Sequence, residues 1–452
     1  MKPIVMNDNS KKKKKEFNDI SNLIEKIANK TLGQLEEDGL FVFPEILKES
    51  DDITKEQVVI KSVDNRYCSS NVMGFIGLGE EQLIIKSRFS ESDSDFFFQY
   101  LLEKVLDLPN IFELVTTSNN DNQVFDLLFF MFPYYLKLAM RKGLYKTYIV
   151  KHYNNENVRG SIDFSRHFRE NTPFVGKFSY NVREFSYDNS LMELIRHTIE
   201  FIKSKPHGYE FLQKTKDEVM AIIAATDNYK YYDRDKIIFE NISNPLRHAF
   251  YYEYRALQRL CIMILRHEKH QMHESNDKIK GILFDGAWLW EEYVNLLIGE
   301  KFYHPRNKKS EGKQYLFKEH RVGWIYPDFI SKDSSNRIII DAKYKPFENI
   351  HGKDYLQILA YMFRFEAKKG IYIYPEKDNL ENPENSELCV ETGTTYDEKK
   401  GEGIRDDIVK KCSFNIPKKD TYENEYKTFR KKMEESETEL HDSIWDNFNI
   451  KT

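Results

Sequence analysis

The sequence has few cysteines and no long hydrophobic run. Only four cysteines occur in 452 residues, and no two of them form a CxxC pair. This scarcity excludes a zinc ribbon or a disulfide framework and is typical of a reducing compartment. The longest apolar run, residues 127–136, is interrupted by Pro133, whereas a membrane-spanning helix needs roughly 20 apolar residues. The first residues also lack the apolar stretch of a signal peptide, so we expect a cytoplasmic protein without a membrane partner.

Neither sign of charge dominates, and a phosphate-binding nucleotide loop is missing. The chain has 68 basic and 73 acidic residues, which gives a net charge of −5. This balance excludes a uniformly basic nucleic-acid coat but leaves room for a local basic groove. No GxxxxGK[ST] stretch occurs, so the chain is not expected to carry its own nucleotide-driven motor. The run Lys11–Lys15 is expected to be a solvated, frayed tail, with a phosphate-binding arm as the alternative.

The composition is that of a globular protein with two or three domains. Apolar residues make up 40% of the chain and charged residues 31%, and domains hold about 150 residues each. We expect a mixed α/β chain with an α+β region over 1–124, a mainly helical region over 125–275 and an α/β module over 276–452. Hydrophobic spacing predicts strands over 72–79 and 83–89 and helices over 93–108, 125–146 and 189–203. Residues 377–403 are expected to be a loop insertion, followed by a strand over 411–416 and a helix over 421–445.

The chemistry concentrates in two strand-like runs that flank a polar turn. Asp328, preceded by Pro327, lies on the first run, and Asp341-Ala342-Lys343 ends the second. Asp341 and Lys343 are two residues apart, so their side chains leave the same face of one strand. Strand pairing can bring Asp328 beside them. Two carboxylates on one face repel each other unless a hard cation lies between them, and Mg²⁺ prefers oxygen ligands.

This arrangement is the PD-(D/E)xK pattern of phosphodiesterases, and four further features support it. Ile338–Ile340 run directly into the motif as a buried central strand should. Glu291 is the candidate acidic residue on the preceding helix, with Glu292 as its competitor. Gln357 and Tyr361 are four residues apart on the following helix and share one face. A further strand follows over 370–375. The predicted catalytic residues are Asp328, Asp341, Lys343, Glu291, Gln357 and Tyr361, and the predicted Mg²⁺ positions are Asp328, Asp341 and Ala342.

A purely structural interpretation of the same residues stays open. Asp341 to Lys343 could be a surface strand end and Asp328 a turn residue, while Gln357 and Tyr361 could serve in packing. Further along the middle region, a set of polar residues could contact a partner or DNA, or form an internal ion network. These residues are Arg159, Asp163, Arg183, Glu184 and Asp188.

With these residues in view, the sequence resembles the LlaJI-type restriction endonuclease subunits, relatives of McrC, the nuclease subunit of the McrBC restriction system. The likeness covers roughly residues 70 to 375. Its nuclease end matches through Leu289-Trp-Glu-Glu-Tyr-Val294, Pro327-Asp328, Asp341-Ala-Lys343 and Gln357-x-x-x-Tyr361. Its middle matches through Lys142-Gly-Leu-Tyr-Lys-Thr-Tyr148, Asn157-Val-Arg-Gly-Ser-Ile-Asp163 and Arg183-Glu-Phe-Ser-Tyr-Asp-Asn189.

The resemblance implies a Mg²⁺-dependent DNA endonuclease subunit of an anti-phage restriction system. It also implies a McrB-like AAA+ GTPase partner, a hexameric ring that an N-terminal region of the nuclease subunit contacts. LlaJI-type systems act on unmethylated DNA and McrBC-type systems on methylated DNA, and the sequence leaves this choice open. Two other functions stay open as well. The chain could be an adaptor that stimulates the ring without cutting, or a stand-alone DNA-repair nuclease with the same core.

Overall fold

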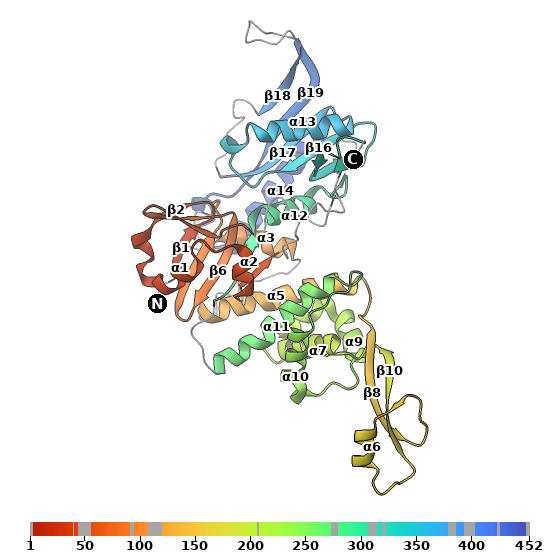
Figure 1. The fold of residues 1–452 in the computed structure, drawn as a ribbon. Coiled ribbons are helices and arrows are strands. Elements are labelled where there is room, and N and C mark those ends of the chain that lie inside the picture. The colour runs from red at the N-terminus through yellow and green to blue at the C-terminus, as the bar shows by residue number, and fades with distance from the viewer. Residues whose placement is uncertain are drawn as a thin grey trace. The chain divides into compact units, whose positions relative to one another are not determined.

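The structure is a computed structural model, shown in Figure 1. It describes residues 3–38, 40–43, 56–90, 95–106, 120–205, 208–272, 279–305, 314–318, 322–377, 386–392, 403–422 and 425–448. The chain divides into two compact units, one made of Met1–Phe112 with Asn276–Thr452 and the other of Glu113–Ser275. Helices and several sheets are both present, which confirms the mixed α/β class. The first and third predicted regions contribute to one unit, and the three-domain division itself stays a prediction.

A five-stranded sheet forms the N-terminal part of the first unit. Its order is β1 (Ile4–Asn7), β7 (Glu81–Lys86), β6 (Val72–Leu78), β11 (Lys280–Asp285) and β3 (Leu40–Phe43). The strand β11 lies between β6 and β3, although it follows the whole second unit in the sequence. Gly74 has a φ of 140°, and a side chain there would collide with the Ile282 carbonyl, so glycine is required for the close approach of β6 and β11. Helices α1 (Ser21–Ile27) and α2 (Leu32–Glu37) bury their apolar faces in the same core.

The lysine run is part of a small sheet, so the prediction of a frayed tail is wrong. Lys11–Lys13 form β2, which pairs antiparallel with β5 (Arg66–Ser69), and β5 pairs with β4 (Ile60–Val63). Lys14 and Lys15 begin a 3-10 helix that extends over Lys14–Ile20. Phe17 and Ile20 on that helix are buried and anchor the run to the core. The buried residues that follow the lysines therefore order a segment that its charge alone would leave in solvent.

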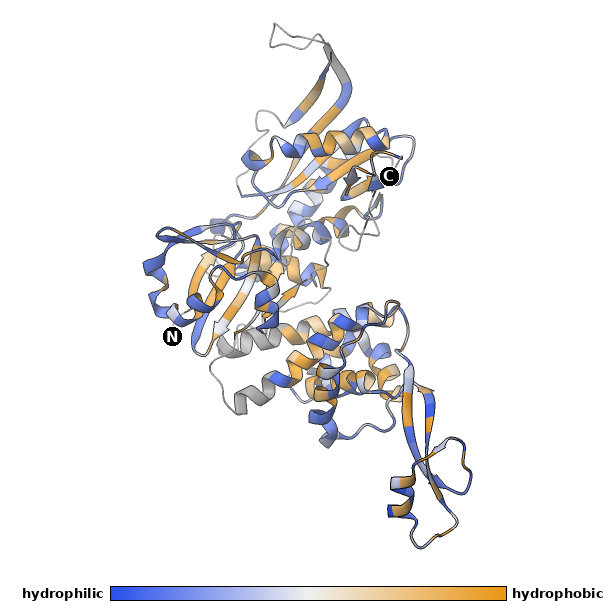
Figure 2. Cartoon of the chain, viewed as in Figure 1, coloured by the Kyte–Doolittle hydropathy of each residue, from blue (hydrophilic) through white to orange (hydrophobic). Residues whose placement is uncertain are grey.

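The C-terminal part of the first unit is built on a six-stranded sheet. Its order is β12 (Phe302–Tyr303), β15 (Phe329–Ser331), β16 (Ile338–Ala342), β17 (Lys369–Glu376), β19 (Gly403–Asn415) and β18 (Glu387–Thr392). The central strands β16 and β17 are parallel, buried and drawn mostly in hydrophobic colours in Figure 2. Two short strands, β13 (Gln314–Tyr315) and β14 (Trp324–Ile325), form a separate hairpin. The prediction of a loop over 377–403 missed β18, whose side chains over 387–391 are half-buried or exposed.

Helices cover both faces of this sheet. Helix α13 (Lys353–Phe365) packs Ile358, Tyr361 and Met362 against Ile339 and its neighbours on one face. Helix α12 (Gly286–Ile298) reaches the other face, where Trp290 and Tyr293 contact Phe414. The elements that complete this unit are α3 (Phe96–Val105), α14 (Tyr426–Phe448) and two 3-10 helices, Phe347–Asn349 and Lys419–Thr421.

The second unit is a helical body with a projecting hairpin. Its helices are α5 (Asn120–Met140), α7 (Ser190–Lys203), α8 (Gly208–Leu212), α9 (Lys216–Ala225), α10 (Arg234–Ser243) and α11 (Glu253–Met272), with 3-10 turns at Gln213–Thr215 and Tyr231–Asp233. Helix α5 continues through Pro133. Asn189 begins α7: its side-chain oxygen accepts the Met192 N–H, and its amide group donates to the carbonyls of Tyr145, Ser186 and Tyr187. In the described residues, no helix has the length and apolar composition needed to cross a bilayer.

The hairpin of the second unit has one exposed face and one half-buried face. It consists of β8 (Thr147–Asn155), β9 (Ser161–Ile162) and β10 (Phe178–Ser186), with α6 (Phe164–Glu170) near its tip. The five polar residues highlighted in the sequence lie in or beside it. Asp163 caps α6, Glu184 pairs with Lys151 and Tyr153, and Arg183 stacks on Tyr148. Asp188 accepts hydrogen bonds from Asn228. These contacts are internal to the second unit, and the choice between an ion network and a contact with a partner or DNA stays open.

Candidate active site

The paired strands β15 and β16 bring the two motif aspartates together. The register places Phe329 opposite Ile340, so Asp328 and Asp341 lie at the same end of the pair. The Asp328 carboxylate accepts the Ala342 backbone N–H at 2.8 Å. Asp341 is only 1% exposed, since it ends a central strand between β15 and β17. The hairpin predicted from the sequence thus forms, and it places both carboxylates at the same end of the β15–β16 pair.

Charge crowding at this position is strong. The pKa of Asp328 is raised well above its usual range, first by burial and then by the negative charges of Asp341 and Glu291. The Lys343 ammonium and the Ala342 N–H oppose this rise. Glu291, on α12, is therefore the helix carboxylate that acts on Asp328. Its catalytic role stays a prediction.

Lys343 joins the strand carboxylates to helix α13. Its Nζ lies 2.6 Å from Asp341 Oδ2 and donates to Gln357 Oε1 at 3.0 Å. Burial acts to lower the pKa of this ammonium, but the Asp341 and Asp328 carboxylates outweigh burial and raise the pKa above its ordinary value. Lys343 is therefore a fixed positive charge at neutral pH, held against the carboxylates.

Gln357 and Tyr361 complete the network from α13. Gln357 Nε2 donates to Tyr361 Oη at 2.6 Å, so the two residues share a face as their spacing predicts. Burial, followed by the charge of Asp341, raises the pKa of the Tyr361 hydroxyl. All six predicted catalytic residues are thus connected, either by direct hydrogen bonds and ion pairs or through their charges. Whether they catalyse a reaction stays a prediction.

Two residues of this site were missed by sequence reasoning. His304 Nδ1 lies 2.9 Å from the Asp328 carbonyl oxygen, and the ring stacks on Phe329. The other ring nitrogen lies 3.8 Å from Glu291 Oε1 and 3.7 Å from Glu292 Oε1. Burial acts to lower the pKa of His304, but its bonds to Glu292 and Asp328 outweigh burial and raise that pKa. No local motif marks this histidine, because it reaches the site through the pairing of β12 with β15.

The second missed residue, Asp354, lies on α13 one turn before Gln357. Its Oδ2 binds Lys345 Nζ at 2.7 Å, and its Oδ1 lies 3.8 Å from Lys343 Nζ. The Tyr372 hydroxyl donates to the Asp354 carbonyl at 2.6 Å. The three-residue spacing from Gln357 was the signal that could have identified it, since residues three apart share a helix face.

The donor set fits a hard divalent cation. Asp328, Asp341 and Glu291 offer only carboxylate oxygens. The pKa of Asp328 is raised first by burial and then by the charges of Asp341 and Glu291, and a bound cation would offset both effects. Within the described residues no group of three or more acidic, histidine or cysteine side chains is arranged to enclose a metal by itself. Mg²⁺ does not require such a group, because it keeps several waters and needs only one or two protein carboxylates.

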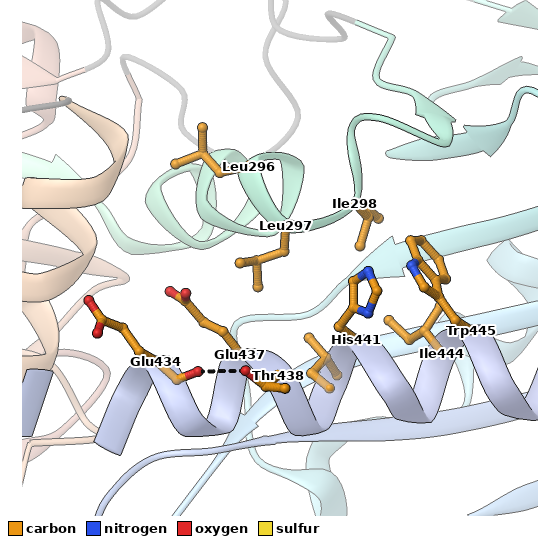
Figure 3. A pocket seen from close by; sticks show the side chains of 10 residues that line it. Leu296, Leu297, Ile298, Glu434, Glu437, Thr438, His441, Ile444 and Trp445 are labelled. Atoms are coloured by element: carbon orange, nitrogen blue, oxygen red, sulfur yellow. Dashed lines mark hydrogen bonds between the residues drawn. The ribbon is translucent and has the colours of Figure 1, made fainter. Parts of the chain in front are cut away.

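A pocket of about 350 Å³ lies elsewhere in the same unit, between α12 and α14. Figure 3 shows Leu297, Ile298 and Trp445 beside Glu437 and His441 around it. None of the candidate catalytic residues lines this pocket. It is a packing gap between two helices and not the candidate active site.

Comparison with known proteins identifies the family. The model of the McrBC 5-methylcytosine restriction system component matches residues 69–375. No curated protein matches the chain. A solved structure described as a half-complex of Thermococcus gammatolerans McrB AAA+ hexamers with bound McrC is 15% identical, covers 96% of this chain and 100% of its own, and has a TM-score of 0.46. A Thermococcus gammatolerans McrBC complex is 15% identical, covers 66% of this chain and 87% of its own, and has a TM-score of 0.31. Because the family model spans well over half of the sequence, this chain belongs to the McrBC restriction system component family.

Proposed function

We propose that this chain is the nuclease subunit of a GTPase-dependent DNA restriction system and hydrolyses phosphodiester bonds with Mg²⁺. The observation that carries the proposal is the meeting of Asp328, Asp341 and Lys343 at one end of the β15–β16 pair, where the charge of Glu291 acts on Asp328. These are the residue types, in the order, that a PD-(D/E)xK nuclease core requires. The LlaJI-type resemblance of the sequence supports the same assignment.

Each residue has a task in this proposal. Asp328, Asp341 and Ala342 would hold the cation. Mg²⁺ bound there would stabilise the charge that develops on the phosphate and lower the pKa of a bound water. The Lys343 ammonium stabilises that charge electrostatically or orients the attacking water. Gln357 and Tyr361 hold Lys343 in place through the hydrogen-bonded chain from Lys343 to Gln357 to Tyr361.

The partner in this proposal is a McrB-like AAA+ GTPase ring. The description of one similar structure names McrC bound to McrB AAA+ hexamers, and this chain has no GxxxxGK[ST] motif of its own. The N-terminal region, 1–124, is one candidate for the ring contact. The hairpin of the second unit is the other, because exposed apolar clusters mark interaction sites. In the described part of residues 1–112, Val63 is the only large apolar side chain that is exposed. The hairpin exposes ten: Tyr148, Val150, Val158, Ile162, Phe164, Phe168, Phe174, Val175, Phe185 and Tyr187.

Plasmid cleavage tests the proposal. Wild type, Asp341→Ala and Lys343→Ala would each be incubated with Mg²⁺ or EDTA, with and without the partner GTPase and GTP, on methylated and unmethylated plasmid. We expect the wild type to cut the plasmid only when Mg²⁺, the partner and GTP are all present. The cleavage rate of each variant should be at least about 100-fold lower, since each substitution removes charge stabilisation of the transition state. Pull-down of the partner by each variant checks that folding survives.

Other outcomes point to the alternative functions. Retained cutting in either variant would contradict the site assignment. Full-rate cutting by the chain alone would indicate a stand-alone DNA-repair nuclease. Stimulated GTP hydrolysis without cutting on any plasmid would indicate an adaptor subunit.

A further inference from the structure

The outward face of the small sheet carries a row of cations that the candidate active site does not use. In a β-sheet, paired residues on neighbouring strands point to the same side, and alternate residues of one strand point to opposite sides. The register pairs Lys11 with Cys68 and Cys68 with Lys61. It also pairs Lys13 with Arg66 and Arg66 with Val63. Four cations therefore share one face, here named the basic face: Lys11, Lys13, Lys61 and Arg66.

Burial shows which side of the sheet faces solvent. All four side chains of the basic face are exposed. The opposite row, Lys12 with Tyr67 and Ser62, points inward, since Tyr67 packs on the hydrophobic core and its ring lies 5.1 Å from that of Phe17. The lysine run is thus divided by the pleat, with alternate lysines on the two sides.

Among the described residues, the side chains of the basic face have no carboxylate paired with them. The strands β2, β4 and β5 contain five basic and no acidic residues. Lys12, on the inner row, lies 3.9 Å from Glu16, but in the described part of the chain no residue of the basic face forms an ion pair. Asp64, in the turn between β4 and β5, is the acidic residue nearest in sequence. Such a concentration stands out in a chain with a net charge of −5.

We propose that the basic face binds the phosphate backbone of duplex DNA. Lys11 and Lys13 project about 7 Å apart along one strand, and Lys61 lies two strands away at about 10 Å. A rigid array of this size matches an extended polyanion, which can engage every charge at once, whereas one acidic side chain engages one or two. Such contacts position DNA without reading its sequence. The inference rests on the proposed nuclease function, to which it adds a DNA contact on a sheet other than the one that carries Asp328 and Asp341.

Salt-dependent binding of the full chain to DNA tests this inference. Fluorescence anisotropy would follow a labelled 30-base-pair duplex of mixed sequence in EDTA, from about 25 to 200 mM NaCl. The variant carries Lys11→Gln, Lys13→Gln, Lys61→Gln and Arg66→Gln. We expect its binding to weaken at least about tenfold at 50 mM NaCl and its log–log salt slope to fall by about 3.6, because each of the four lost phosphate contacts removes about 0.9.

Two controls separate the face from net charge and from folding. Lys12→Gln changes the same lysine run on its inner side and should leave the slope unchanged. A charge-matched variant replaces four exposed lysines elsewhere, Lys216, Lys230, Lys427 and Lys431, by glutamine. Unchanged binding in the basic-face variant, or equal weakening in the charge-matched one, would overturn the inference. Normal DNA binding with lost GTPase stimulation would also overturn it, since the face would then contact the protein partner. Because the assay needs no metal or cutting, it is independent of whether the proposed nuclease activity holds.

Discussion

The ring of His304 lies between the Asp328 backbone and the carboxylates of Glu291 and Glu292 on α12. A backbone carbonyl only accepts hydrogen bonds, so Nδ1 must donate to the Asp328 oxygen at 2.9 Å. His304→Phe keeps a ring that can stack on Phe329 but removes this donor. We expect cleavage to fall about 10- to 100-fold, the range observed when residues that orient metal-binding groups are replaced. Steady-state cleavage at saturating partner and GTP, titrated with Mg²⁺, measures the loss.

His304→Asn serves as the conservative control. Its amide nitrogen can occupy nearly the position of Nδ1, so part of the activity should return. If His304 served only in packing, His304→Phe would cleave DNA faster than His304→Asn. That ranking, or equal Mg²⁺ midpoints in the wild type and His304→Phe, would contradict the positioning role.

The two parts of the site differ in how far the sequence predicts them. The sequence predicts that Asp341 and Lys343 lie on one face because side chains alternate along a strand. It predicts that Asp328 lies beside them because a short polar turn joins the two strands. His304 depends on which strand pairs with β15. Asp354 has a local signal in its three-residue spacing from Gln357, but its contact with Lys343 depends on how α13 packs on the sheet. The structure shows that the charge of Glu291 acts on Asp328 and that both Glu291 and Glu292 lie near His304, whereas the catalytic role of either carboxylate stays a prediction.

At the level of elements, Glu437 ties α14 to two other helices. Its Oε1 accepts hydrogen bonds from the hydroxyls of Tyr100 at 2.7 Å and Tyr293 at 2.8 Å, from α3 and α12. Lys104 adds an ion pair at 3.3 Å. Glu437→Ala would leave two buried hydroxyls without this acceptor, and each unpaired buried group costs about 1–3 kcal/mol. We expect the free energy of unfolding of the first unit to fall by about 3 kcal/mol, measured by urea denaturation.

Glu435→Ala is the matched control on the same helix. Glu435 is exposed, and surface substitutions of this kind change stability by about 0.5 kcal/mol or less. Similar losses in the two variants would mean that the removal of a carboxylate from α14, and not the loss of the Tyr100 and Tyr293 hydrogen bonds, sets the stability of this junction.

The element-level predictions failed where charge pattern and burial point in different directions. Lys11–Lys13 look like a tail because nothing in the run itself is apolar, yet Phe17 and Ile20 behind it are buried. The insertion over 377–403 looks like a loop because it is polar and turn-rich, yet β18 pairs with β19 at the edge of the sheet. Edge strands need only one neighbour and can stay polar, so periodicity gives them a weak signal.

At the level of the whole molecule, the second unit should lose stability in acid through His197. This residue is fully buried on α7, and neither ring nitrogen has a hydrogen-bond partner among the described residues. Burial, and then the charges of Arg234 and Arg196, lowers the pKa of His197 to about 4. The folded form keeps the ring neutral, whereas the unfolded form gains a proton below about pH 6.5. The contribution of His197 to the free energy of unfolding is therefore fully present above about pH 6.5, and it falls by about 3 kcal/mol as the pH drops toward 4.

Variants isolate this contribution from other titrating groups such as Glu193. Thermal unfolding followed between pH 7 and 4.5 should show a shallower loss for His197→Leu than for the wild type. His248→Leu, which replaces an exposed histidine in the same unit, should follow the wild type. Identical slopes for the wild type and His197→Leu would exclude His197 as the acid-sensitive group.

The division of the chain into units could not be inferred from sequence order. Residues 280–285 directly precede the helix that carries Glu291, so the sequence assigns them to the nuclease-like module. In the structure they form β11 and pair with β6 and β3 of the N-terminal sheet. Sequence patterns report local periodicity, and a strand that pairs with segments some 200 residues away carries no local mark of its partner.

The position of β11 in the sequence affects how the N-terminal sheet can fold during translation. Strands β3 and β6 leave the ribosome early, but the strand that lies between them follows roughly 200 residues later, a delay of about 10–40 s at ordinary translation rates. During that interval the facing edges of β3 and β6 have no strand between them, and open strand edges are templates for aggregation. Yield on overexpression should therefore depend on elongation speed and on chaperones that shield nascent strands.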